Sequence, residues 1–125
     1  MSKRIQRKRN RGWRMPENTK YCGRPTMWGN PFKEVGDIVY VDAGHRRKVL
    51  DRWVYYGSVS ETGGAAKIFH DLLMDLNSRP VAPEIYNRFR LMRDRIFDLR
   101  GFDLACFCPL HSKCHVDSLL LLANY

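Results

Sequence analysis

The sequence predicts an α/β domain, a single small unit of two or three layers built on a short, mainly parallel sheet. Two observations predict this class. Apolar residues recur at three- and four-residue spacing over 64–76 and 83–100, which is typical of amphipathic helices. Short apolar runs bounded by glycine or proline, at 37–41 and 102–108, alternate with these helices along the chain. This alternation favours strands layered against helices.

The 125 residues are enough for one hydrophobic core, and we expect a single domain over 1–125. The net charge of +9 is unevenly distributed. Residues 1–24 carry nine Lys or Arg and one acidic residue, whereas residues 25–125 carry thirteen basic and twelve acidic residues. The positive charge therefore belongs to an N-terminal arm of about residues 1–15. Such an arm is typical either of a solubilising tail or of contact with nucleic acid or another polyanion.

No apolar run approaches the roughly 20 residues needed to cross a bilayer. The first residues also lack the apolar core of a secretory signal. We therefore expect a cytoplasmic protein without a membrane partner. In a reducing compartment, the four cysteines are better interpreted as metal ligands or reactive thiols than as disulfides.

Glycine and proline punctuate residues 20–32 so densely that a shaped loop is expected there. Within it, Arg24 offers a fork of hydrogen-bond donors, Trp28 a stacking face and Asn30 an amide. Together with Gly29, these residues suit a planar or phosphorylated ligand. We expect Arg24 to hold a phosphate, and Trp28 and Asn30 to hold a base.

The middle of the chain predicts one strand and one helix. Residues 37–41 form a short strand between glycines, whereas residues 45–56 fit either a helix or a strand. Thr62 can cap a helix over about 64–76. His70 lies among the polar positions of that helix and is expected at the surface.

Pro83 suits the first turn of a second helix, which is expected to run to about Arg100. Gly101 is the expected left-handed stop. A buried strand over 102–108 follows. After a short loop, residues 114–123 form the final helix.

Three cysteines and a histidine fall within ten residues at this junction of strand and helix: Cys106, Cys108, Cys114 and His115. α/β proteins position ligands and catalytic groups at such junctions. One interpretation is zinc, held by the three cysteines with either His115 or His111. The spacing weakens it, because residues i and i+2 of an extended strand lie roughly 6.5–7 Å apart. Two sulfurs on one zinc lie less than ~4 Å apart, so the strand would have to bend at the proline after Cys108.

The other interpretation is thiol or imidazole chemistry. Cys114 begins the final helix, whose positive end lowers the pKa of a thiol. His115 can act as a general acid or base near neutral pH, and Asp117 can orient it or cap the helix. Cys114, His115 and Asp117 are therefore the expected catalytic group, with Cys106 beside the ligand.

The chain resembles a bacterial and phage family, domain of unknown function 4326. The matching segments are 4–7, 12–16, 23–32, 99–110 and 114–124. The resemblance implies that the basic arm belongs to the domain, and that the 23–32 loop and the Cys–His junction work together. The family usually has tryptophan where this chain has Phe107. Its phage occurrence favours nucleotide or nucleic-acid chemistry, or interference with a host protein.

The sequence therefore predicts a domain that binds a nucleotide or nucleobase. If it catalyses, the reaction is transfer or hydrolysis at a nucleotide, with Cys114 and His115 as the reactive pair. The alternative is a non-enzymatic module that binds nucleic acid or protein and contains a structural zinc.

Overall fold

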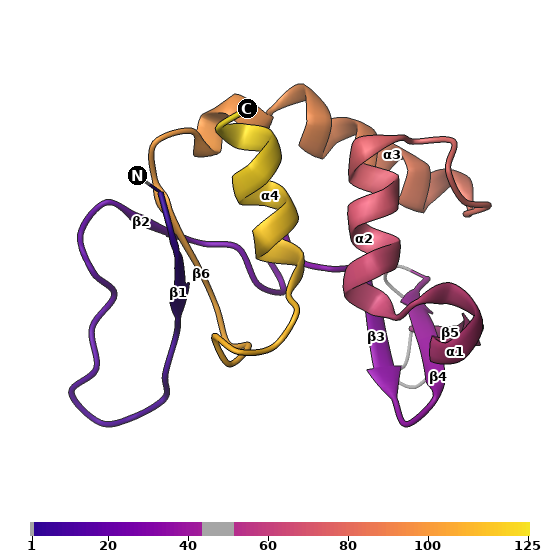
Figure 1. The fold of residues 1–125 in the computed structure, drawn as a ribbon, viewed down its shortest axis with the longest axis horizontal. Helices are drawn as coiled ribbons and strands as arrows, with labels where there is room; N and C mark the ends of the chain where they lie inside the picture. The colour runs from indigo at the N-terminus through magenta and orange to yellow at the C-terminus, as the bar shows by residue number, and fades with distance from the viewer. Residues whose placement is uncertain (1, 44–51) are drawn as a thin grey trace.

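The computed structural model describes residues 2–43 and 52–125, and within them it contains two small sheets with helices packed against them (Figure 1). The first sheet is parallel, in the order β1 (Arg4–Gln6), β6 (Asp103–Cys106), β2 (Thr19–Tyr21). The second is antiparallel, in the order β3 (Phe32–Val35), β4 (Ile38–Asp42), β5 (Trp53–Ser58). The helices are α1 (Val59–Thr62), α2 (Ala65–Met74), α3 (Pro83–Asp94), a 3₁₀ helix (Ile96–Leu99) and α4 (His115–Ala123).

The α/β class is confirmed, but the single, mainly parallel sheet is wrong. The second sheet arises at Gly36 and Asp37, which alone connect β3 to β4, with Val35 opposite Ile38. A two-residue turn reverses the chain, so the strands it joins are antiparallel. Gly36 has a φ of 60°, a conformation that glycine adopts at low steric cost.

The strand expected at 37–41 is confirmed as β4. Part of the ambiguous stretch 45–56 is also settled, because residues 53–58 form β5 and pair with β4. The rest of that stretch, up to residue 51, lies outside the described residues.

The parallel sheet has its central strand, β6, near the C-terminus of the chain. β1 and β2 flank it, so residues 4–6 of the basic N-terminal segment are a strand of the sheet. At the carboxyl end, the N–H of Arg7 donates to the carbonyl of Cys106 at 2.7 Å. On the other side, the N–H of Cys22 donates to the carbonyl of Ala105 at 2.8 Å. The carboxyl ends of all three strands therefore meet around Cys106.

The helices differ from expectation at their ends. Gly64 rather than Thr62 is the N-cap of α2, and the Thr62 hydroxyl instead accepts the Gly64 N–H. The helix expected from Pro83 to about Arg100 is α3, which ends at Asp94. A 3₁₀ turn over 96–99 replaces its expected last turn. Because residues i and i+3 of a 3₁₀ helix lie on one face, the apolar spacing continues through the break. Gly101, at a φ of 84°, is confirmed as the left-handed stop.

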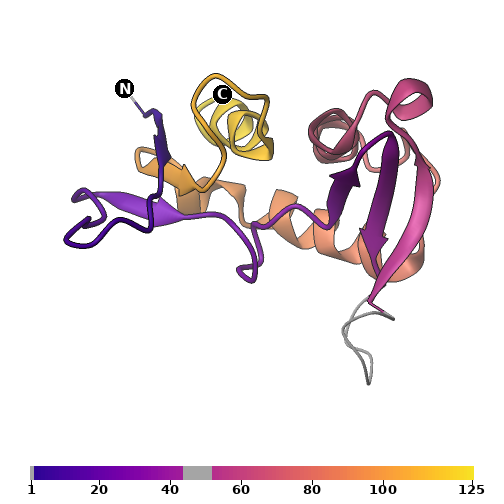
Figure 2. The same cartoon turned by 90° about the horizontal axis from the view of Figure 1, so that it is seen from below.

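The core lies between the helices and the two sheets, with α4 over the parallel sheet and α2 over the antiparallel one (Figure 2). Phe69 on α2 contacts both α4 and α3, because the centre of its ring lies 5.0 Å from that of His115 and 5.1 Å from that of Phe89. His70 is half-buried rather than at the surface, and its Nδ1 lies 2.9 Å from the Ser118 hydroxyl of α4. None of the described helices combines the length and apolarity needed to cross a membrane.

Candidate metal centre

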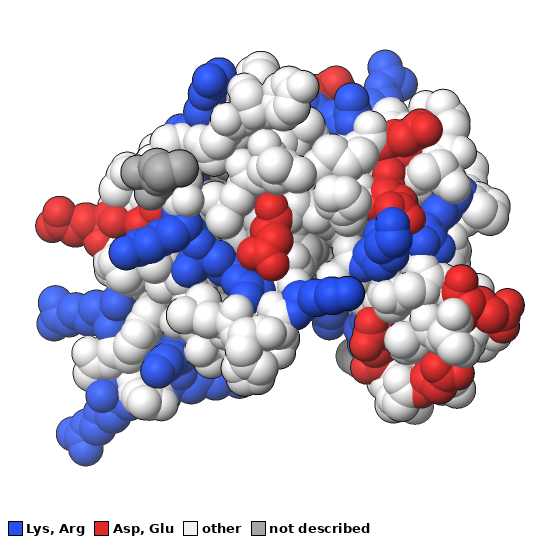
Figure 3. Space-filling view, viewed as in Figure 1, with Lys and Arg blue, Asp and Glu red and all other residues white. Residues whose placement is uncertain are grey.

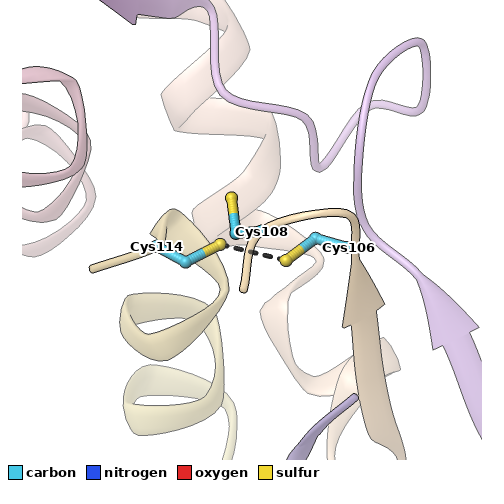
Figure 4. Close-up of side chains that lie close together, drawn as sticks. All are labelled: Cys106, Cys108 and Cys114. Carbon is cyan, nitrogen blue, oxygen red and sulfur yellow. Dashed lines mark hydrogen bonds between the residues drawn. The ribbon is translucent and has the colours of Figure 1, made fainter. Parts of the chain in front are cut away.

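The sulfurs of Cys106, Cys108 and Cys114 converge at the carboxyl end of the parallel sheet (Figure 4). All three lie within 4.8 Å of one another, and those of Cys106 and Cys114 are 3.1 Å apart. Two thiolates bound to one tetrahedral zinc at about 2.3 Å each lie less than ~4 Å from each other. Small adjustments of these side chains therefore suffice to hold a metal ion.

The convergence follows from where β6 ends. The strand expected over 102–108 covers only Asp103–Cys106, and Phe107 and Cys108 form a bend. The backbone between Cys106 and Cys108 is not extended, so the separation of roughly 6.5–7 Å in an extended strand does not apply to these two residues. The turn after Pro109 then returns the chain to Cys114, the N-cap of α4, which brings the third sulfur to the other two.

Arg4 holds the loop between the second and third cysteine in place. Its side chain is only 8% exposed. Nη2 donates to the carbonyls of Pro109, Leu110 and Ser112 at 3.3, 2.6 and 2.9 Å, while Nε lies 3.4 Å from the Asp117 carboxylate. One guanidinium on β1 therefore ties the cysteine loop to the start of α4.

The remaining nitrogen of this guanidinium, Nη1, is buried and makes no hydrogen bond to an oxygen or nitrogen of the described residues. The Arg4 side chain as a whole also interacts with Cys114. Burial lowers the pKa of Arg4, but hydrogen bonding to Cys114 and the negative charges of Asp117 and Cys114 outweigh it and raise the pKa. Arg4 is thus the counter-charge of the cysteine cluster.

The cluster favours negative charge on two of its three sulfurs, those of Cys108 and Cys114. Hydrogen bonding by the Cys106 thiol lowers the pKa of both Cys108 and Cys114, and it raises the pKa of Cys106 itself. The positive charges of Arg4 and Arg24 further lower the pKa of Cys108. The thiolate is the form of cysteine that binds metals. Cys22 differs: it is fully buried and does not belong to the cluster, and burial raises its pKa to about 12.

His115 is buried beside the cluster and does not join it. Its Nε2 lies 2.8 Å from the carbonyl of Cys22, which can only accept, so Nε2 carries the hydrogen. Its Nδ1 faces Cys114, 3.6 Å from Sγ. Among the described residues, the group whose ligand atoms all lie within 4.8 Å comprises the three cysteines alone, without His115 or the exposed His111.

The structure brings Cys114 and His115 together but places Asp117 elsewhere. The Asp117 carboxylate is 57% exposed and pairs with Arg4, and none of the described side chains caps α4. The carbonyl of Cys22, which sequence reasoning did not single out, orients His115 instead. Cys22 lies beside His115 because the pairing of β2 with β6 continues to its N–H, which donates to the carbonyl of Ala105.

A cleft of about 880 Å³ opens over the cysteine cluster, between the two sheets. Four basic side chains line it, against the single carboxylate of Glu34: Arg9, Arg24, Lys33 and Lys113. Figure 3 shows the molecule hollowed between its two lower lobes, with Lys and Arg at the edges of the hollow. The cleft is therefore suited to a negatively charged ligand.

The 23–32 loop meets this cleft only in part. Arg24 and Asn30 line it, but Trp28 is 8% exposed and packs in the core, where it offers no free face to a ligand. Gly29 packs against the loop itself, because a Cβ there would lie 3.0 Å from the Arg24 Cα. The loop and the cysteine junction are therefore the two sides of one cleft, without the tryptophan.

Arg24 and Asn30 also make internal contacts. Asn30 Oδ1 accepts the N–H of Phe32 at 2.9 Å, and its Nδ2 donates to the carbonyl of Ala65 at 3.2 Å, which ties the loop to α2. Arg24 Nε donates to the carbonyl of Asn30 at 3.1 Å, and its guanidinium stacks 4.9 Å from the Trp53 ring. Burial lowers the pKa of Arg24, although the charge of Asp42 opposes this.

We expect Asn30→Ala to lower the free energy of unfolding by about 2–3 kcal/mol, because it leaves a buried N–H and a carbonyl unpaired. Chemical denaturation monitored by circular dichroism measures this. Asn87→Ala is the matched control, since Asn87 is exposed on α3, and it should change stability by less than about 0.5 kcal/mol. Equal losses in both variants would contradict a structural role for Asn30.

These features define a small mixed α/β domain with a cluster of three cysteines that can hold a metal ion. The chain belongs to the DUF4326 family: the sequence model of this domain of unknown function matches residues 5–125. The resemblance carried by the two motifs is thereby confirmed. No curated protein and no solved structure matches the chain.

Proposed function

We propose that the chain is a zinc-binding domain in which Cys106, Cys108 and Cys114 supply three thiolate ligands. The observation that carries this proposal is the convergence of the three sulfurs within 4.8 Å. Thiolates are soft ligands that suit zinc, whereas magnesium and calcium prefer oxygen. Arg4 and Arg24 supply positive charge beside the cluster, which offsets the net negative charge of one zinc with three thiolates.

A zinc held by these three cysteines would have a fourth position open to the cleft, because all three cysteines line it. His115 Nδ1 approaches Cys114, but a hydrogen bond to Cys22 holds the ring, and His115 is not within reach of all three sulfurs. Zinc sites with three protein ligands and an open position are typical of catalysis, with a water or a substrate in fourth place. A zinc-bound Cys114 cannot also be a free nucleophile, so metal content decides between the two chemistries considered for this residue.

The ligand we propose for the cleft is of the nucleotide type. Its phosphate would lie among the four basic side chains, where the fork of Arg24 suits a phosphate group. Its base would lie against Tyr21 and Phe107, which line the cleft, in place of Trp28, which does not. The cleft volume is in the range of small-molecule sites.

Protein purified under reducing conditions is expected to contain about one zinc per chain by elemental analysis. Replacement of zinc by Co²⁺ should give thiolate-to-cobalt charge-transfer absorption of the intensity expected for three thiolates. Addition of a nucleoside monophosphate should change the ligand-field bands, because the open position lies in the cleft. A chain that is metal-free as purified and gives no cobalt–thiolate absorption refutes the zinc site.

Cys22→Ala is the matched control, because it removes a cysteine outside the cluster and should leave zinc content and the cobalt absorption unchanged. If the zinc site is present but the cobalt bands do not respond to the nucleotide, the zinc proposal stands and the proposed ligand is wrong.

A further inference from the structure

A second surface adjoins the cleft and shares Arg9, Tyr21 and Phe107 with it, whereas the three cysteines of the proposed zinc site are not part of it. Residues 3–14, here called the basic lobe, carry seven Lys or Arg and no acidic residue. They comprise β1 and most of the connection to β2, which projects at one end of the molecule (Figure 1). Within the described part of the chain, Arg4 is the basic-lobe residue that pairs with a carboxylate. The other Lys and Arg side chains of the lobe form no ion pair with the described residues.

Two arginines of this lobe are held in fixed positions by aromatic rings. The guanidinium of Arg7 lies 4.5 Å from the Tyr21 ring centre and 5.3 Å from that of Phe107. That of Arg9 lies 4.4 Å from the Phe107 ring, and the two rings meet edge to face at 5.9 Å. The four side chains form one stack, here called the arginine–aromatic stack.

The side-chain donors of these arginines are unpaired within the described part of the chain. Among the described residues, neither the Arg7 nor the Arg9 side chain makes a hydrogen bond or an ion pair, and each is placed by its ring contacts instead. Other arginines use their donors within the protein: Arg79 pairs with Asp71, and Arg93 donates to carbonyls of α2. Pre-positioned guanidinium groups with free donors are suited to phosphate, and ordering them costs little on binding.

We propose that the basic lobe binds single-stranded nucleic acid. The phosphates of the nucleic acid contact the Lys and Arg side chains of the lobe, and its unstacked bases pack against the arginine–aromatic stack. Planar arginine and aromatic faces bind bases in this way, and only a single strand presents its bases for stacking. Because Arg9, Tyr21 and Phe107 also line the cleft, the bound strand leads to the cysteine cluster.

Fluorescence anisotropy with a labelled 15-nucleotide single strand, the corresponding hairpin duplex and polyglutamate tests this surface. The single strand is expected to bind at least about tenfold more tightly than the duplex, since each stacked base contributes roughly 1–3 kcal/mol. Affinity should fall with salt, with a slope of about −0.7 per phosphate contact. Arg7→Gln with Arg9→Gln should weaken binding about tenfold or more and reduce the slope by about 1.4.

The matched control is Arg90→Gln with Arg100→Gln, which removes the same charge from exposed positions. Arg100 also stacks on an aromatic ring, that of the exposed Phe97, at 5.4 Å. This pair should change affinity less than about twofold. Phe107→Leu should remove the preference for the single strand and leave the salt slope unchanged, because it removes a stacking face and no charge.

Four results overturn the proposal: absence of binding, equal affinity for the duplex, equal affinity for polyglutamate, or equal losses in the test and control pairs. Circular dichroism of each variant confirms that it is folded. The surface does not depend on the metal, so zinc content is measured on the same samples. If the protein contains no zinc but binds the single strand as expected, only the metal site is disproved. If it contains zinc but does not bind the single strand, only the nucleic-acid surface is disproved.

Discussion

Cys108→Ser is expected to lower the affinity for zinc by more than about 100-fold and to leave a folded protein. Loss of residues that only support a ligand costs about 10- to 100-fold in metal affinity, so loss of a ligand costs more. Cys108 is the half-buried member of the cluster and lies in a bend outside β6, so its substitution disturbs the core less than substitution of the buried Cys106 or Cys114. Competition with a chromophoric zinc chelator measures the affinity.

Cys106→Ser and Cys114→Ser are expected to lose zinc to the same extent and also to lose stability, because both residues are buried. A serine hydroxyl without a partner in such a site costs roughly 1–3 kcal/mol. The comparison separates the two roles of the cluster. If Cys108→Ser keeps full zinc affinity, then the three-thiolate site is wrong, whatever the other two variants do.

The spacing of apolar residues and the positions of glycine were sufficient to predict several helices, strands and turns that depend mainly on neighbouring residues in the sequence. The apolar spacing of α2 and α4, the strand β4 and the left-handed Gly101 all appear within a few residues of their expected positions. The position of the cysteine junction at the carboxyl end of a parallel sheet also followed from the order of strand, loop and helix.

The division into two sheets could have been predicted in part. A Gly-Asp pair between two strands is a hairpin signal, and Gly36-Asp37 is such a pair. β3 before it, Phe32–Val35, contains Lys and Glu at its centre and exposes most of its side chains, so it lacks the apolar run of a buried strand. The turn of the hairpin could therefore be recognised in the sequence, but β3 lacked the apolar pattern that would have predicted a strand.

Long-range pairing could not be predicted. β1 is three residues long within a run of basic side chains, too short to show alternation, and its partner β6 lies about 100 residues away, with Arg4 opposite Leu104. The role of Arg4 depends on that pairing. The bend at Phe107 and Cys108 begins before the proline at which the sequence allowed one, so the expected distance between Cys106 and Cys108 was that of an extended strand.

Arg4→Ala is expected to cost about 2–4 kcal/mol of stability, the largest loss for any residue of the basic lobe. The substitution removes a nearly buried guanidinium and leaves three loop carbonyls and Asp117 without their partner. Breaking a fully buried charge pair costs about 3–5 kcal/mol, and the value here is lower because Asp117 is more than half exposed. Denaturation of the metal-free protein in EDTA measures the loss without a contribution from zinc.

Arg4→Lys separates charge from geometry. Lysine keeps the positive charge near the cysteines, but an ammonium group cannot bond three loop carbonyls and Asp117 at once while also facing a sulfur. We expect it to recover less than half of the lost stability and to leave zinc affinity about 10- to 100-fold below that of the unchanged chain, since the loop that joins two ligands is no longer held. Arg95→Ala, which removes the exposed pair with Asp98 and a 3.8 Å contact with the Met27 sulfur, is the control and should change stability by less than about 0.5 kcal/mol. Full recovery by lysine would mean that Arg4 acts through its charge alone, and that the hydrogen bonds to the loop do not position the cysteines.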